Sequence, residues 1–252
     1  MEEISDRQIE ELEHLNQLKD DFLSTVSHEL RSPITNIKMA IQMLKLLVHK
    51  DESREKAKVD RYLLILEEEC DREINLLNNL LNLQQLDAGN YCVNQTPVHL
   101  QEAIPQIIKP FLQRIANQQQ TLQLEIAANL SVLTVDRIGL ERILTELLTN
   151  ACKFTPIGGT IAVMLSWNLQ STQSLKIFQL KVTNSGVDIP VREWDRIFDR
   201  FYRIVNGDRW KYDGTGLGLT LVKKLTEHLG GSIWVESGTG QTCFTVEIPV
   251  ND

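Results

Sequence analysis

The chain has 252 residues, a formal net charge of −8 and four cysteines. Its length suggests one or two domains with enough apolar residues for a sizeable core. An acidic chain is not expected to be a general nucleic-acid binder, since such proteins are usually basic. The cysteines have no paired spacing for a disulfide or a metal, and no apolar run reaches the roughly 18–20 residues that span a bilayer. We therefore expect reduced thiols, no membrane segment and a cytoplasmic location.

Residues 1–21 are highly charged, with apolar residues at helical intervals, and we expect a coiled-coil stalk that continues into the next helix. The chain starts within this helix, which leaves open that it is the cytoplasmic end of a longer protein. A buried helical stripe is predicted from residue 22 to about residue 48. Its members are Phe22, Val26, Leu30, Pro33 or Ile34, Ile37, Ile41 and Leu44.

His28 is the first candidate for chemistry. At about 100° per residue, it lies roughly 200° from Val26 and Leu30, so it should point away from the stripe. Pro33 cannot donate a hydrogen bond to the carbonyl of Glu29, which predicts a bend beside the histidine. An exposed imidazole next to a carboxylate suits a nucleophile with its base, although most lone surface histidines have no such role.

A charged segment, residues 49–60, is expected to separate this helix from a second one that ends near Gly89. The second helix carries its own apolar face, formed by Leu63, Leu66, Cys70, Ile74, Leu77 and Leu81. Two such helices form an αα-hairpin whose stripes stay half covered. Pairing two copies would bury them in a four-helix bundle, so we expect a C2 homodimer.

After Gly89 the pattern changes to mixed helix and strand, which predicts an α/β sandwich. We expect strands at 98–100, 160–168, 175–183, 233–236 and 242–248, a hairpin of strands at 121–126 and 131–135, and helices at 104–119, 137–154 and 217–229.

Three polar residues of the helix at 137–154 share one face, because Glu146, Asn150 and Lys153 are spaced by four and three. An amide oxygen can ligate Mg²⁺ while an amine reaches phosphate, and magnesium often takes only one or two protein ligands. Taken alone, the pattern also fits an ordinary solvated helix face.

Two glycine-containing loops strengthen the prediction of a nucleotide site. NSGVDIP (184–190) follows a strand, and DGTGLGL (213–219) precedes a helix. Glycine lets backbone N–H groups approach phosphate closely, and a helix N-terminus adds a favourable dipole. Neither loop is a Walker A motif, and one glycine-rich loop alone also fits a flexible turn. The polar stretch at 203–215 could close over a nucleotide as a lid.

Five motifs in this order resemble those of two-component sensor histidine kinases: SHELRSP (27–33), ELLTNACKFTPIGG (146–159), VTNSGVDIP (182–190), IFDRFYR (197–203) and GTGLGLTLVKKLTEHLGG (214–231). They resemble the family's H, N, G1, F and G2 boxes, and the resemblance covers about residues 15–250. It implies a dimerisation and histidine-phosphotransfer hairpin at 22–89 and a Bergerat-type (GHKL) ATP-binding domain at 90–252. It also implies ATP and Mg²⁺ as cofactors and the receiver domain of a response regulator as partner.

The resemblance further implies a role for each matching residue. His28 would accept the phosphoryl group and Glu29 would act as general base, while Ser32 stands where the family places its phosphatase residue. Asn150 would hold Mg²⁺, supported by Glu146. The full set implied for ATP binding is Glu146, Asn150, Lys153, Asn184, Gly186, Asp188, Ile189, Phe198, Phe201, Arg203, Gly214, Thr215, Gly216, Leu217 and Gly218. In this set Lys153 would meet phosphate, Phe198, Phe201 and Arg203 would order the lid, and Gly214, Gly216 and Gly218 would frame the triphosphate.

Two residues depart from the family's pattern. Asn184 replaces the aspartate that accepts a hydrogen bond from the adenine amine, and an uncharged acceptor should cost on the order of 1 kcal/mol, or several-fold in affinity. Replacing Asn184 by aspartate is therefore expected to tighten ATP binding. Asp188 replaces a glycine, and we expect it to tolerate a left-handed backbone. An ATP-site-degenerate dimeric scaffold is the alternative to an active kinase. An ATPase without a phosphohistidine is a third reading, against which the H box argues.

Overall fold

The computed structural model describes residues 2–47, 56–130, 132–169, 176–204 and 214–250; for residues 2–23, 28 and 169 it describes the backbone alone. The chain divides into two compact units, Met1–Asn78 and Asn79–Asp252. No helix in the described ranges is both long and apolar enough to cross a membrane.

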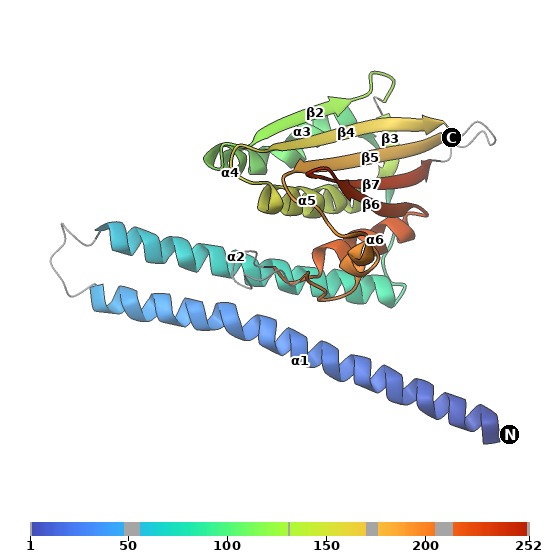
Figure 1. Ribbon diagram of the computed structural model, residues 1–252, viewed down its shortest axis with the longest axis horizontal. Helices are drawn as coiled ribbons and strands as arrows, with labels where there is room; N and C mark the ends of the chain where they lie inside the picture. The colour runs from blue at the N-terminus through green and yellow to red at the C-terminus, as the bar shows by residue number, and fades with distance from the viewer. Residues whose placement is uncertain (1, 48–55, 131, 170–175, 205–213, 251–252) are drawn as a thin grey trace. The chain divides into compact units, whose positions relative to one another are not determined.

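The first unit is a pair of helices, α1 (Glu2–Leu47) and α2 (Lys56–Asp87), and the C-terminal turns of α2 belong to the second unit (Figure 1). Helix α1 continues through Pro33, which is buried. Helix α2 starts inside the charged segment that the sequence placed between the helices. The helix can begin within the charged segment because its first residues, Lys and Ala, are strong helix formers.

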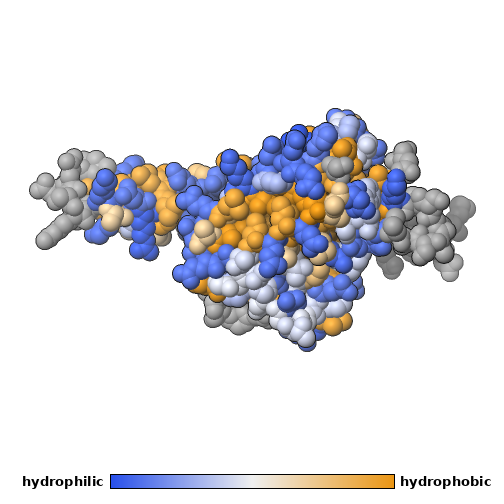
Figure 2. All heavy atoms as spheres, turned by 90° about the horizontal axis from the view of Figure 1, so that it is seen from above, coloured by the Kyte–Doolittle hydropathy of each residue, from blue (hydrophilic) through white to orange (hydrophobic). Residues whose placement is uncertain are grey.

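The hairpin has one covered and one uncovered apolar face. Ala40 and Leu76 are each 2% exposed, and Asn36 Nδ2 donates to Glu69 Oε1 at 3.0 Å. The predicted stripe of the second helix lies on the uncovered face, where Leu63, Ile74, Leu77 and Leu81 are 46–57% exposed. Figure 2 shows hydrophobic residues among hydrophilic ones on the part of the hairpin surface that faces the viewer.

The second unit is built on a five-stranded sheet in the order β2-β4-β5-β7-β6. Its strands are β2 (Thr121–Ile126), β4 (Thr160–Leu169), β5 (Lys176–Ser185), β6 (Ser232–Gly238) and β7 (Gln241–Val250). Three helices cover one face of this sheet: α3 (Leu100–Ile108), α5 (Arg137–Phe154) and α6 (Gly218–His228) (Figure 1). Side chains alternate along β5, so that Phe178, Leu180 and Val182 enter the core beneath the helices.

Three local predictions are wrong. Strands β2 and β3 (Val132–Asp136) do not form a hairpin: β2 pairs in parallel with β4, while β3 pairs with β1 (Gln95–His99). The helix predicted at 104–119 is broken into α3, a 3₁₀ turn at Lys109–Phe111 and α4 (Leu112–Asn117). Pro110 causes the break, since proline has no N–H for the helical ladder. The short strand at 98–100 is longer and ends at His99, because Leu100 opens α3.

Asp136 holds the start of α5. Its Oδ1 accepts from the N–H groups of Ile138 and Gly139 at 3.1 and 3.3 Å, which caps the helix, and its Oδ2 accepts from the Tyr91 hydroxyl at 2.8 Å. The carboxylate is 2% exposed, so both contacts are shielded from water. Helix α5 is therefore anchored at one end, which orients the polar side chains further along it.

Replacing Asp136 by alanine should lower the free energy of unfolding by about 2–4 kcal/mol. A lost N-cap typically costs ~1 kcal/mol, and a buried hydroxyl left without its partner adds ~1–3 kcal/mol. Urea unfolding followed by circular dichroism measures the change. Asp136→Asn is the matched control, because the amide oxygen can still cap the helix, and it should retain more than half of the lost stability. A loss below about 0.5 kcal/mol for the alanine variant would contradict this role of Asp136.

Candidate nucleotide-binding site

The polar face of α5 lies on the side of the helix toward α6, against which α5 packs. Glu146 Oε1 accepts from Asn79 Nδ2 at 3.1 Å, and Arg142 Nη2 donates to Asn79 Oδ1 at 3.4 Å. Burial raises the pKa of the Glu146 carboxyl, while the Asn79 hydrogen bond and the Arg142 charge lower it by less. Asn79 comes from the end of α2, and no spacing in the sequence links it to Glu146.

Replacing Glu146 by glutamine should raise the melting temperature at pH 7.5. The amide oxygen can keep the Asn79 contact, while the burial cost of the charge disappears, and each kcal/mol corresponds to roughly 2–4 °C in a domain of this size. Because the folded pKa lies above the unfolded value, the wild type loses stability as pH rises from 4.5 through the folded pKa. The advantage of the variant should therefore shrink toward pH 4.

Calorimetric scans of both proteins between pH 4 and 8 measure this effect. Glu141→Gln is the matched control, because Glu141 lies on the exposed side of the same helix. A Glu146→Gln protein that melts at or below the wild-type temperature at pH 7.5 would show that the buried charge is not costly.

Two glycines at or near the start of α6, Gly214 and Gly218, lie directly against α5 side chains. A Cβ atom on Gly214 would lie 2.6 Å from Lys153 Nζ, and one on Gly218 would collide with the Glu146 carboxylate. Leu217 is fully buried, and its N–H donates to Thr215 Oγ1 at 3.4 Å. The structure thus brings the N-box and G2-box residues together, with bare backbone facing an amine and a carboxylate. Such a backbone can approach phosphate closely.

Gly216 and Phe201 join the G2 and F boxes. The Phe201 N–H donates to Gly216 O at 3.0 Å, and the two residues have φ angles of 68° (Gly216) and 60° (Phe201). A Cβ on Gly216 would lie 2.7 Å from two backbone atoms of Phe201. A phenylalanine with positive φ is strained, and such strain concentrates at functional sites.

Phe198 anchors the other end of the F box. It is 7% exposed, and its ring meets Phe244 edge-on at 6.4 Å between centroids. Arg203 is exposed at the end of this segment. Most of the predicted lid at 203–215 lies outside the described residues, because the structure does not describe 205–213.

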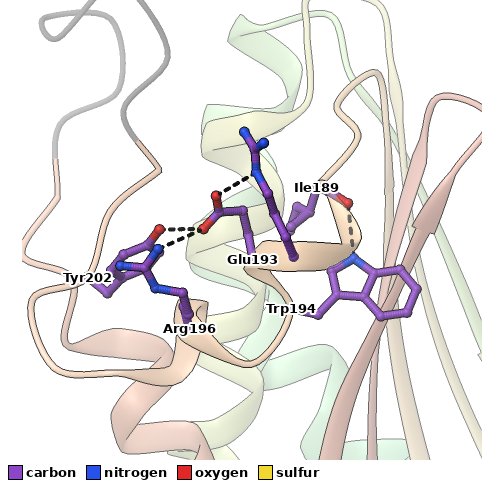
Figure 3. A network of polar contacts seen from close by, with 6 residues as sticks. Ile189, Glu193, Trp194, Arg196 and Tyr202 are labelled. Atoms are coloured by element: carbon purple, nitrogen blue, oxygen red, sulfur yellow. Dashed lines mark hydrogen bonds and ion pairs between the residues drawn. The ribbon is translucent and has the colours of Figure 1, made fainter.

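A polar network braces the segment between the G1 and F boxes (Figure 3). The Tyr202 hydroxyl donates to the Glu193 carboxylate, and Arg196 reaches the same oxygen at 3.9 Å. The Tyr202 hydrogen bond lowers the pKa of Glu193 and raises the pKa of Tyr202. The Trp194 indole donates to Ile189 O at 3.0 Å, which ties this network to the G1 loop. No motif in the sequence analysis pointed to Glu193 or Trp194.

The G1 loop is fastened to the turn between β6 and β7. Gly186 has a φ of 100°, and its N–H donates to Gly240 O at 2.6 Å. The N–H of Ile189 donates to Ser237 Oγ at 2.8 Å. Asp188 is not among the residues with positive φ, so the left-handed backbone that it was expected to tolerate is not required of it. Its carboxylate instead accepts from the Gly240 N–H at 2.9 Å, and so it fastens the loop rather than straining it.

Asn184 lies at the end of β5, opposite Ile161 of β4 and Thr242 of β7. Its side chain is 5% exposed and belongs to the face of β5 that is buried in the core. Its Nδ2 is buried without a hydrogen-bond partner among the described residues. An unpaired buried donor is costly unless a ligand supplies an acceptor.

The remaining predicted residues lie in the other unit. His28, Glu29 and Ser32 all belong to α1, where Glu29 is half-buried and Ser32 is exposed one turn after His28. The described residues contain no cluster of three or more His, Cys, Asp or Glu side chains that could hold a metal ion without other ligands.

Comparison with known proteins identifies two domains in the chain. Residues 18–89 match the His Kinase A (phospho-acceptor) domain, and residues 135–252 match the histidine kinase-, DNA gyrase B- and HSP90-like ATPase. A phospho-acceptor domain followed by an ATPase domain of this kind is the catalytic core of a protein-histidine kinase. The chain belongs to the sensor histidine kinases, and its ATPase domain is an ATP-binding domain.

Named relatives of the chain are also histidine kinases. The chain is 28% identical over 249 residues to the sensor histidine kinase WalK of Bacillus subtilis, covering 97% of this chain and 39% of WalK. It is 34% identical over 238 residues to the circadian input-output histidine kinase CikA of Synechococcus elongatus, covering 93% of this chain and 30% of CikA. The chain thus spans about a third of the length of these curated relatives. The fold resembles that of the Acinetobacter baumannii histidine kinase AdeS, with a TM-score of 0.66 and 22% identity over 89% of this chain and 98% of AdeS.

Proposed function

We propose that this kinase core transfers the γ-phosphoryl group of ATP to His28 and then to an aspartate on the receiver domain of a response regulator. The observation that supports this most directly is the close approach of Gly214 to Lys153 and of Gly218 to Glu146, in a chain that also carries a phospho-acceptor domain around His28. We also propose that residues 1–21 form a signalling stalk, 22–89 the dimerisation and phosphotransfer domain, and 90–252 the catalytic domain. The core would act in the cytoplasm.

Positioning and charge neutralisation provide most of the catalysis in phosphoryl transfer. Asn150 would present its amide oxygen to Mg²⁺, with Glu146 supporting the metal shell and Lys153 meeting phosphate. Bound Mg²⁺ would neutralise charge that develops on the phosphate oxygens. The backbone N–H groups at Gly214–Gly218 would cradle the phosphates, and the N-terminal dipole of α6 favours negative charge there.

On the acceptor side, Glu29 would withdraw the proton from the His28 imidazole as the nitrogen attacks phosphorus. Phe198, Phe201 and Arg203 would order the segment that covers the nucleotide. The bonds of the G1 loop to Gly240 and Ser237 would hold Asn184 in place for the base.

We further propose that the protein is a homodimer. The uncovered face of the hairpin carries Leu63, Ile74, Leu77 and Leu81, and burying such side chains stabilises a four-helix bundle by roughly 25 cal/mol per Å² of apolar surface. Light scattering on the purified chain should give the mass of two copies.

A response regulator and a phosphatase reaction belong to the same proposal. A structure of the histidine kinase ThkA in complex with the response regulator protein TrrA has the same fold, with a TM-score of 0.65 and 22% identity. A 29% identical relative from Vibrio harveyi is called the autoinducer 2 sensor kinase/phosphatase LuxQ. Ser32 keeps a hydroxyl that could orient water for the phosphatase reaction, but it lacks the methyl group that restricts a threonine rotamer.

Incubation of the chain with γ-labelled ATP and Mg²⁺ tests the kinase proposal. The expected product carries label that is lost in acid and kept in alkali, and peptide mapping should place it on His28. Nucleotide binding without any phosphohistidine would instead support the degenerate scaffold. ATP hydrolysis without protein label would support an ATPase that uses water as acceptor.

A further inference from the structure

Asn184 presents a hydrogen-bond donor where the family's aspartate can only accept. Asparagine carries both an NH₂ donor and a C=O acceptor, whereas an ionised carboxylate has acceptors alone. In this chain the amide is 5% exposed, and its Nδ2 has no partner within the described part of the protein. The donor is thus buried and unpaired.

Two hydroxyl groups beside Asn184 on the paired strands make contacts of their own. Across the strand, the Thr242 hydroxyl donates to Val187 O at 2.6 Å and also contacts Ser237 Oγ at 2.7 Å. The Ser185 hydroxyl accepts from the Thr160 N–H at 2.8 Å. These contacts fasten the strand end on which Asn184 lies.

Purine bases differ in the pattern that such an amide would meet. Adenine has a donor at its 6-amino group and an acceptor at N1, whereas guanine and hypoxanthine have an acceptor at O6 and a donor at N1. An amide matches the first pattern in one orientation and the second after a half turn of its terminal group. A carboxylate matches the amino group but faces O6 with a lone pair, which is repulsive.

We propose that Asn184 makes the base subsite accept 6-oxopurine nucleotides as well as adenine nucleotides. The proposal rests on the proposed function of these residues as the nucleotide site. It deepens that function by defining which phosphoryl donors the kinase can use. Specificity is a difference of affinities, and removing a repulsive contact against a competitor is enough to reduce it.

Calorimetric titration with ADP, IDP and GDP tests the proposal, because diphosphates carry no γ-phosphate and the measurement is independent of kinase activity. For the wild type we expect the Kd values of IDP and ADP to lie within ten-fold of each other. GDP tests in addition whether the subsite has room for a 2-amino group. In Asn184→Asp the ratio of the IDP to the ADP dissociation constant should rise at least ten-fold.

The matched control is Asn117→Asp, an identical change of charge at an exposed position of the same unit, and it should leave the ratio unchanged. A wild type that binds ADP but binds IDP more than ten-fold more weakly would overturn the base proposal alone. Binding of none of the diphosphates would overturn it together with the proposed nucleotide site. The comparison on the wild type decides the question even where the Asn184→Asp protein does not fold.

Discussion

Replacing His28 by glutamine should reduce phosphoryl incorporation from labelled ATP by at least about 1,000-fold, the effect typical of losing a nucleophile. A carboxamide keeps much of the polarity and size of imidazole but has no lone pair that can attack phosphorus. ADP binding should stay unchanged, because the proposed nucleotide-binding residues are all in Asn79–Asp252.

His99→Gln provides the matched control for this prediction. His99 is an exposed residue of β1 in the ATPase unit, and its replacement should leave incorporation at the wild-type level. Acid-labile label that persists in the His28→Gln protein would place the phosphoacceptor on another histidine. Loss of label together with loss of ADP binding would point instead to a folding defect.

Much of the second unit was predictable because its elements have clear local patterns. The helix expected at 137–154 has those limits in the structure, since Asp136 caps one end and the apolar spacing persists throughout. The strands around 160–168 and 175–183 were found as β4 and β5, where alternation with a buried core face is regular. Local signals of this kind need no knowledge of distant partners.

Pairing was harder, because it depends on residues far apart in the chain. Strands β2 and β3 both alternate and are close in sequence, which favoured a hairpin. In the fold, β2 finds a parallel partner in β4, and β3 pairs with β1. Nothing in the spacing of 121–135 distinguishes these outcomes, since an alternating pattern shows which side of a strand is buried but not which strand lies beside it.

In the candidate site, too, the local patterns were predictable and the contacts between distant residues were not. Spacing on one helix placed Glu146, Asn150 and Lys153 together, and the glycine motif marked the loop that lies against two of them. The contact of Asn79 with Glu146, and that of Asp188 with Gly240, could not be anticipated. They join residues 67 and 52 positions apart, and neither pair belongs to a sequence period.

Asp188 shows that a residue which departs from a family motif can add a contact of its own. In the sequence it stands where a glycine is usual, and we expected it to tolerate a left-handed backbone there. The structure shows ordinary backbone at Asp188 and a carboxylate that bonds to the Gly240 N–H. A side chain absent from glycine therefore contributes a contact to the loop, and Asp188 gives no support to a degenerate site.

Gly216→Ala should weaken ADP binding at least ten-fold and lower the free energy of unfolding by about 2–5 kcal/mol. A side chain in the left-handed region costs roughly 1–2 kcal/mol, and overpacking against a fixed neighbour adds ~1–3 kcal/mol. Here the neighbour is the backbone of Phe201, 2.7 Å from the new Cβ, with Tyr202 O at 3.0 Å. Neither can rotate away, so the F and G2 boxes should separate and the phosphate cradle should lose its shape.

Two matched variants separate the backbone strain of Gly216→Ala from its overpacking. Gly89 has a φ of 66°, and a Cβ added there would have no atom within 4 Å, so Gly89→Ala should show the backbone strain alone, about 1 kcal/mol, with normal ADP binding. Gly238 has open space and no positive φ, and its replacement should change stability by less than about 0.5 kcal/mol. Urea unfolding and ADP titration of the three proteins measure both quantities. A Gly216→Ala protein that binds ADP as the wild type does would show that the contact between Phe201 and Gly216 does not shape the nucleotide site.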